Sequence, residues 1–145
     1  MVCLICIRYL TPTVTIGKST FARRLASGMP TAFTRINQDE LGSRQKCELK
    51  CREAINENKI PIIDRCNFDD LQRKHFLDIA VECGNIQIHC VIFRYSREVC
   101  IERCRKRVQH ETIKKGQEAA VVTRLANFFS PPESTMFHVV KTITS

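Results

Sequence analysis

Short apolar runs alternate along the chain with longer segments in which apolar residues recur at helical spacing. Ile86–Phe93 (IQIHCVIF) is the strongest strand pattern, and Val2–Ile7 is a second buried strand. Further strands are predicted at Ala32–Ile36, Ile60–Ile63 and His138–Ile143, and helices at Lys18–Ser27, Ser43–Asn58, Asp69–Cys83, Ser96–Val108 and Glu118–Phe129. Strands separated by helices of this length predict an α/β fold, a three-layer sandwich around a mostly parallel central sheet.

Length and charge limit the possible organisation and partners. The 145 residues predict one domain, residues 1–145, expected to act as a monomer. A net charge of +8 favours a polyanionic partner such as nucleic acid or nucleotide phosphates. The apolar start Met1–Ile7 is too short to span a bilayer and lacks the features of a signal peptide. We therefore expect no membrane partner. Nine cysteines, an odd number, indicate free thiols in a reducing compartment, so we expect a location in the nucleus or cytoplasm.

The tetrapeptide Gly17-Lys18-Ser19-Thr20 lies between a predicted strand and the start of a predicted helix. Backbone N–H groups at such a helix start hold phosphate oxygens, the lysine reaches the β- and γ-phosphates, and the serine hydroxyl binds Mg²⁺. Gly17, Lys18, Ser19 and Thr20 are therefore expected to bind ATP, with Ser19 also a ligand of Mg²⁺. An ordinary helix start is the less favoured alternative.

The segment before this motif departs from the pattern G-x-x-x-x-G-K-[ST]. Pro12 stands where the first glycine belongs, and the β-branched residues Thr13–Ile16 follow it. Such residues resist the backbone angles of a phosphate-binding loop. The sequence therefore leaves open a domain that binds nucleotide or nucleic acid but is catalytically impaired.

Two acidic residues follow predicted strands. Asp39 lies in the stretch NQDELGS, where a carboxylate can accept the proton of an attacking hydroxyl; alternatively, Asp39 or Ser43 caps the next helix. Asp64 ends the strand PIID, as in a Walker B strand whose carboxylate helps to hold Mg²⁺. Arg65 and Asn67 follow it and are expected, with Arg44, to contact substrate. The alternative is an asparagine turn and an Asp69 helix cap.

A basic segment follows the strongest strand. Arg97–Lys115 carries seven lysines and arginines against three glutamates, and Arg103 and Arg107 share a helix face. Arginines in a helical lid over the phosphates stabilise charge on the transferring group. A solvated basic helix is the alternative interpretation.

These four features together resemble the kinase domain of the polynucleotide kinase/phosphatase family. The resemblance is carried by GKSTFARRL, INQDELGSRQKCE, PIIDRCNFDDLQR and the basic lid helix, and it extends from about Gly17 to the C-terminus but not over Arg8–Ile16. It implies a P-loop kinase fold in which Asp39 activates the 5′-hydroxyl. Lys18 and Ser19 would correspond to the family's phosphate-loop residues, Asp64 to its acidic residue after the central strand, and the Arg103–Arg107 run to its lid arginines.

The resulting prediction is an ATP- and Mg²⁺-dependent kinase that transfers the γ-phosphate of ATP to the 5′-OH end of DNA or RNA. Asp39, Arg103 and Arg107 would be catalytic, and Ser19 and Asp64 would be near the metal. Roles in DNA repair or RNA processing follow from this reading. A small-metabolite P-loop kinase and the impaired binding domain remain the alternatives.

Overall fold

The computed structural model describes residues 3–9, 17–65, 67, 69–84, 86–106, 116–117, 119–120, 123 and 134–144. Its strands are β1 (Cys3–Tyr9), β2 (Phe33–Asn37), β3 (Ile60–Asp64), β4 (Gln87–Arg94) and β5 (Val139–Thr144). Its helices are α1 (Lys18–Gly28), α2 (Gln38–Leu41), α3 (Arg44–Asn56), α4 (Asp70–Glu82), α5 (Arg97–Lys106) and the 3₁₀ turn η1 (Ser134–Met136). Each strand predicted from the apolar runs is present. The helix expected at Glu118–Phe129 lies largely outside the described residues.

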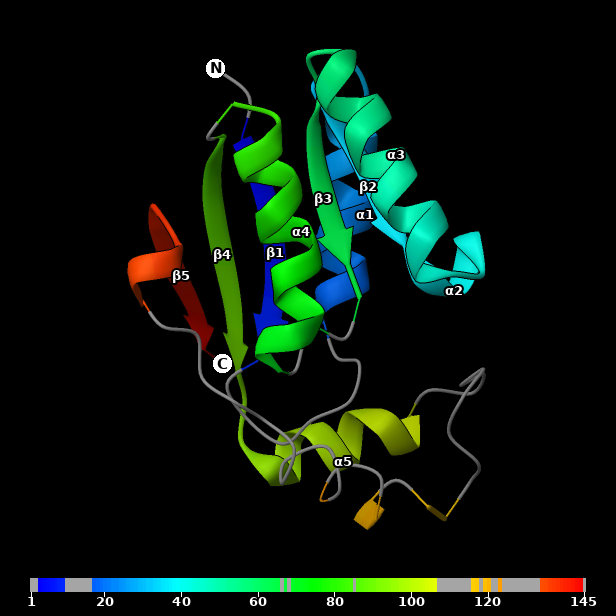
Figure 1. The fold of residues 1–145 in the computed structure, drawn as a ribbon. Helices are drawn as coiled ribbons and strands as arrows, with labels where there is room; N and C mark the ends of the chain where they lie inside the picture. The colour runs from blue at the N-terminus through cyan, green and yellow to red at the C-terminus, as the bar shows by residue number, and fades with distance from the viewer. Residues whose placement is uncertain are drawn as a thin grey trace.

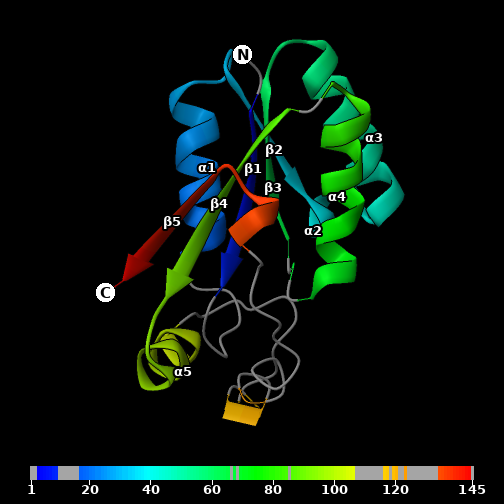
Figure 2. The ribbon, with the colours of Figure 1, turned by 60° about the vertical axis from the view of Figure 1, so that its left-hand side comes forward.

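The five strands form a parallel sheet in the order β2-β3-β1-β4-β5. Helix α1 covers one face of this sheet, and α3 and α4 cover the other, so the molecule has three layers (Figures 1 and 2). All carboxyl ends of the strands meet at one edge, beyond which α5 lies (Figure 1). The predicted α/β sandwich with a parallel sheet is confirmed.

Alternating residues of the inner strands fill two separate cores. Ile63 of β3 and Cys90 and Ile92 of β4 face α3 and α4, where they join the larger cluster. Their neighbours Ile62, Val91 and Phe93 face α1. Both faces of the strands are apolar because both are covered by helices, which explains the unbroken apolar runs in the sequence.

The cysteines at helical spacing belong to the core on the α3 side. Cys47 and Cys51 are both fully buried on one face of α3, and burial raises the pKa of the Cys51 thiol to about 12. These thiols therefore stay protonated and serve as small apolar groups. No three described histidine, cysteine or acidic residues are grouped so that they could hold a metal ion.

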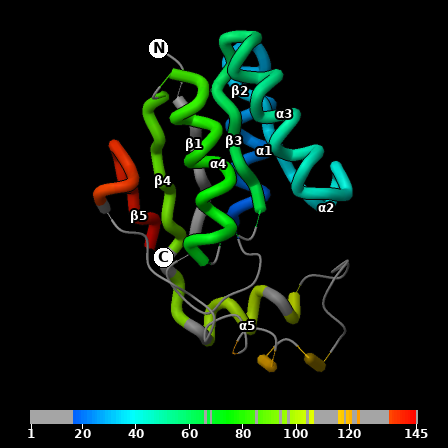
Figure 3. Tube along the Cα trace, in the orientation of Figure 1, coloured from blue at the N-terminus to red at the C-terminus, as the bar shows by residue number. Residues whose placement is uncertain are grey.

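Short polar residues begin the helices next to the carboxyl edge. Ser43 accepts a hydrogen bond from Lys46 N and caps α3, and Asp69 accepts one from Gln72 N and caps α4. Asn37, not Asp39, caps the unpredicted helix α2, which is a single turn between β2 and α3 (Figure 3). Gly42 ends this turn in the left-handed conformation, at φ 81°. None of the described helices is long and apolar enough to cross a bilayer.

Candidate phosphotransfer site

The start of α1 lies at the carboxyl edge of the sheet, where the chain turns from the central strand into its first helix. Gly17 precedes the helix with φ 95°, a left-handed conformation that favours glycine. Its carbonyl accepts a hydrogen bond from Phe21 N at 2.7 Å, so the first turn of α1 is closed. The first N–H groups of an α-helix have no acceptor within the helix, which is why a helix start of this kind can bind phosphate oxygens, as the GKST motif predicts.

Asp64 is the centre of the polar cluster at this edge. Its side chain is fully buried, and its Oδ1 lies 3.4 Å from Lys18 Nζ and accepts a hydrogen bond from Ser19 Oγ at 3.1 Å. Burial alone would raise the pKa of Asp64, but Lys18, Arg35 and Ser19 outweigh this effect and hold the pKa below its usual range. Asp64 is therefore a carboxylate, next to the residues predicted to bind phosphate.

Two polar residues of β2 complete the cluster. The parallel register pairs Asn37 with Asp64 across the sheet, and Asn37 Nδ2 donates to the Asp64 carbonyl at 3.0 Å and to its Oδ2 at 3.2 Å. Arg35 Nε donates to the same Oδ2 at 2.8 Å. Neither residue was assigned a role from the sequence. The available signal was their period-two spacing toward the end of a strand, which places both on the face that α1 covers.

Asp39 lies on α2, directly after β2, and is exposed. Asn37 Oδ1 accepts a hydrogen bond from Glu40 N at 3.1 Å while its amide nitrogen holds Asp64, so one side chain ties α2 to β3. The structure thus brings the helix that carries Asp39 to the same sheet edge as Lys18, Ser19 and Asp64.

The oxygens of Ser19 and Asp64 fit the chemistry expected of a Mg²⁺ site. Mg²⁺ prefers hard oxygen donors and usually binds one or two protein groups together with substrate phosphates. Ser19 Oγ and Asp64 Oδ1 are already adjacent, as one ion would require of its protein ligands. Ser19 and Asp64 would hold the ion, which would supply positive charge to offset that of the phosphates.

Arg103 of α5 approaches the phosphate loop through an aromatic residue that the sequence analysis missed. Its guanidinium carbon lies 4.7 Å from the centre of the Tyr95 ring. A Cβ placed on Gly17 would lie 3.5 Å from the Tyr95 hydroxyl and 3.6 Å from the Phe93 ring. Tyr95 therefore lies between Gly17 and Arg103. Arg107, Pro12 and the rest of the atypical loop lie outside the described residues.

Two of the expected substrate residues contact α4. Arg65 donates to Gln72 Oε1 at 2.7 Å and lies over the Phe76 ring at 5.6 Å. Arg44 Nη1 lies 2.7 Å from His75 Nε2 and 3.3 Å from Glu48 Oε1. These contacts join α4 to the end of β3 and to α3.

Asn67, the third expected substrate residue, is 4% exposed. Its carbonyl accepts a hydrogen bond from the buried Arg73, whereas its side-chain amide has no hydrogen-bond partner in the described part of the chain. Thr20 is exposed on α1.

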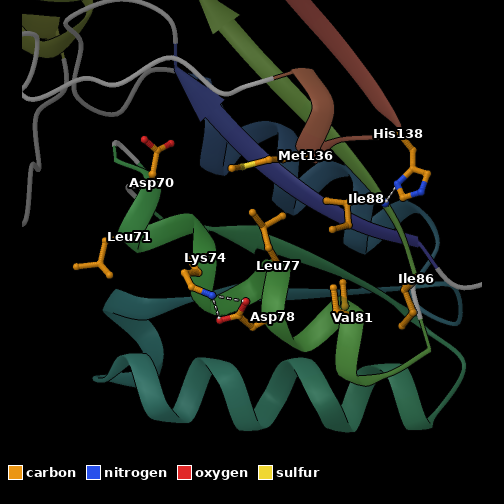
Figure 4. Close-up of a pocket in the computed structure, with 11 residues that line it drawn as sticks. Asp70, Leu71, Lys74, Leu77, Asp78, Val81, Ile86, Ile88, Met136 and His138 are labelled. Atoms are coloured by element: carbon orange, nitrogen blue, oxygen red, sulfur yellow. Dashed lines mark hydrogen bonds and ion pairs between the residues drawn. The ribbon is translucent and has the colours of Figure 1, made fainter.

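A separate apolar groove of about 820 Å³ lies between α4, the start of β4 and η1 (Figure 4). Leu77, Ile88 and Met136 line it, and the paired Lys74 and Asp78 lie on its α4 side. It shares no lining residue with the polar cluster around Asp64, so its chemistry is distinct from that of the phosphate site.

Comparison with known proteins agrees with this geometry. The model of a family described as an AAA domain matches residues 15–132. The chain belongs to this AAA-domain family. The match starts just before Gly17 and includes Lys18, Asp39 and Asp64.

The resemblance to polynucleotide kinase/phosphatases is confirmed by curated relatives. A Schizosaccharomyces pombe protein named Bifunctional polynucleotide phosphatase/kinase is 31% identical over 115 residues, covering 79% of this chain and 28% of that protein. A protein of the same description from Acanthamoeba polyphaga mimivirus is 25% identical over 130 residues, 88% of this chain and 30% of that protein. Transcription factor bHLH140 of Arabidopsis thaliana is 32% identical over 115 residues, 75% of this chain and 12% of that protein. The chain spans less than a third of each relative.

Solved structures confirm the P-loop kinase fold. A gluconokinase from Sinorhizobium meliloti 1021 matches with a TM-score of 0.63 at 13% identity, covering 97% of this chain and 81% of that one. A protein from Chloroflexus aurantiacus named as a kinase matches with a TM-score of 0.64 at 13% identity, covering 98% of this chain and 84% of that one. At this identity the likeness concerns the fold alone.

Proposed function

We propose that this chain is an ATP-dependent kinase of polynucleotide 5′-hydroxyl ends. The observation that carries the proposal is the position of Asp39, on a turn tied through Asn37 to Asp64 and thus to the start of α1. A carboxylate at the sheet edge that also carries a phosphate-binding helix start can accept the proton of an attacking hydroxyl. The curated relatives named as polynucleotide phosphatase/kinases favour a 5′-OH end as that hydroxyl.

In the proposed reaction the helix start at Gly17 and Lys18 binds the ATP phosphates, and Ser19 and Asp64 hold Mg²⁺. Asp39 takes the proton from the 5′-hydroxyl as its oxygen attacks the γ-phosphorus, and ADP leaves. Arg103, with Arg107, offsets charge on the transferring group. The net charge of +8 supports a polyanionic acceptor, because basic side chains gain affinity when they displace counterions from a nucleic acid.

Labelled phosphate transfer tests the proposal directly. The protein is incubated with γ-labelled ATP and Mg²⁺, together with DNA or RNA oligonucleotides that end in 5′-OH, and matched oligonucleotides that end in 5′-phosphate serve as controls. We expect label on the 5′-OH ends only. Transfer to gluconate or a nucleoside but not to oligonucleotides would support the small-metabolite alternative. Absence of transfer, together with absence of Mg²⁺-dependent ATP binding in calorimetry, would support the impaired domain.

Tyr95 provides a test of the lid contact. Tyr95→Ala removes the ring under Arg103, and we expect the rate at saturating ATP to fall about threefold to tenfold, as for loss of a cation–π contact. Tyr95→Phe keeps the ring and should remain within about twofold of the wild type. The two variants are compared in the same transfer assay after thermal melts confirm that they are folded. Equal rates for Tyr95→Ala and wild type would show that this stacking does not serve transfer.

A further inference from the structure

Arg35 lies between two carboxylates that belong to different parts of the site. Its Nε and Nη2 lie 2.8 Å and 2.6 Å from Asp64 Oδ2, and its Nη1 lies 2.6 Å from Glu40 Oε1. Its side chain is only 11% exposed. The planar guanidinium presents donors in several fixed directions, which lets one arginine bind both carboxylates at once.

Glu40 is the residue next to Asp39 on α2. The helix has four residues, none of them buried, and one turn is not stable by itself. Leu41 packs partly buried against the core on the α3 side, and polar ties to neighbouring elements hold the rest of the turn. Asn37 provides one tie through the backbone of Glu40, and Arg35 provides a second through the Glu40 side chain. Both ties end on Asp64.

We propose that Arg35 is a positioning residue that couples the carboxylate of Asp64 to helix α2 and so fixes Asp39 relative to the phosphates. This inference rests on the proposed function, because it assigns Asp39 the role of base. In this proposal Arg35 acts through Asp64 and Glu40, its two carboxylate partners. It holds Asp64 through Oδ2 and leaves Oδ1 facing Ser19 and Lys18, the side on which nucleotide and Mg²⁺ would bind.

The test separates the two ends of the coupling. Glu40→Gln removes the charge at one end and leaves the Arg35–Asp64 pair, so kcat for 5′-OH transfer should fall about threefold with an unchanged KM for ATP, because the Glu40 end is exposed. Arg35→Gln removes both ends and should lower kcat about tenfold or more, since small displacements of a catalytic group are costly.

If Arg35 couples Asp64 to Glu40, the reductions in kcat caused by Arg35→Gln and Glu40→Gln should not multiply. The double variant Arg35→Gln/Glu40→Gln should be no slower than Arg35→Gln, because Glu40 acts only through Arg35. Arg35→Lys keeps the charge but not the fork, so it should not restore the wild-type rate. Glu82→Gln is the matched control: it breaks an Arg52–Glu82 pair between α3 and α4 and should leave kcat unchanged. Multiplying effects, or an Arg35→Lys variant as fast as wild type, would overturn the coupling.

Hydrogen exchange supplies a readout that does not depend on activity. Amides of residues 38–41 should exchange about threefold faster in Glu40→Gln and faster still in Arg35→Gln, but not in Glu82→Gln. If the wild type transfers no phosphate while exchange responds in this way, the proposed function fails and the structural coupling stands. If transfer occurs but α2 exchanges alike in all variants, the coupling is wrong and the function stands.

Discussion

Asp39→Asn should lower the rate of phosphate transfer to 5′-OH ends by about 10²–10⁴-fold, the usual contribution of a general base. Asparagine has nearly the same shape but cannot accept the proton of the attacking hydroxyl. Because Asp39 is exposed on α2 and outside the cluster around Asp64, the change should leave the fold and the ATP site intact. The affinity for Mg·ATP, measured by calorimetry, should therefore equal that of the wild type.

Lys18→Ala gives the contrasting result that makes this prediction specific. Lys18 begins α1 and is 5% exposed beside Asp64, so its removal should weaken ATP binding as well as transfer. Asp39→Asn should lower phosphate transfer without weakening ATP binding, whereas Lys18→Ala should lower both. Unchanged transfer in Asp39→Asn would remove Asp39 from the chemistry. Loss of ATP binding in that variant would instead show that it acts on the nucleotide site.

Most of the sheet could be predicted from the sequence because strands such as β3 and β4 are buried on both faces. The run PII before Asp64 is apolar, IQIHCVIF is apolar except at Gln87 and His89, and the intervening segments are long enough for crossover helices. Helix α2 could not be predicted from periodicity because it is a single turn in which Leu41 is the one apolar residue and none is fully buried. Only its Asn37 cap and Gly42 end mark it, whereas Ser43, one of the two residues expected to cap the following helix, caps α3.

Part of the site could also be predicted from the sequence, because some of its residues are marked by their neighbours along the chain. Gly17, Lys18, Ser19, Asp39 and Asp64 are set by local order along the chain, a motif before a helix or an acid after a strand. Arg35 and Tyr95 acquire their roles from contacts between distant segments. The register of β2 on β3 brings Arg35 to Asp64, and the end of β4 brings Tyr95 to Gly17. Neither contact follows from local spacing.

Asp64 should also be the largest single contributor to stability among the site residues. Asp64→Asn keeps the shape of the side chain but leaves the buried Lys18 and the partly buried Arg35 facing a neutral amide. Removing one charge from a buried pair typically costs about 3–5 kcal/mol of unfolding free energy. Urea unfolding followed by circular dichroism measures the difference. The surface variant Glu57→Gln, which breaks an exposed pair with Lys59, should change the midpoint little.

The pH dependence of this difference follows from the direction of the shift. The pKa of Asp64 is lower in the folded protein than in the unfolded chain, where it is about 3.9. The unfolded state therefore binds the proton first as the pH falls, and the stabilisation by Asp64 is complete above about pH 5. It decreases below about pH 4 and is lost once the pH passes below the folded pKa. The difference in unfolding free energy between wild type and Asp64→Asn should accordingly be constant from about pH 5 to 8 and decrease at lower pH. A gap that is the same at pH 3 and pH 7 would show that packing, and not the charge of Asp64, stabilises this edge of the sheet.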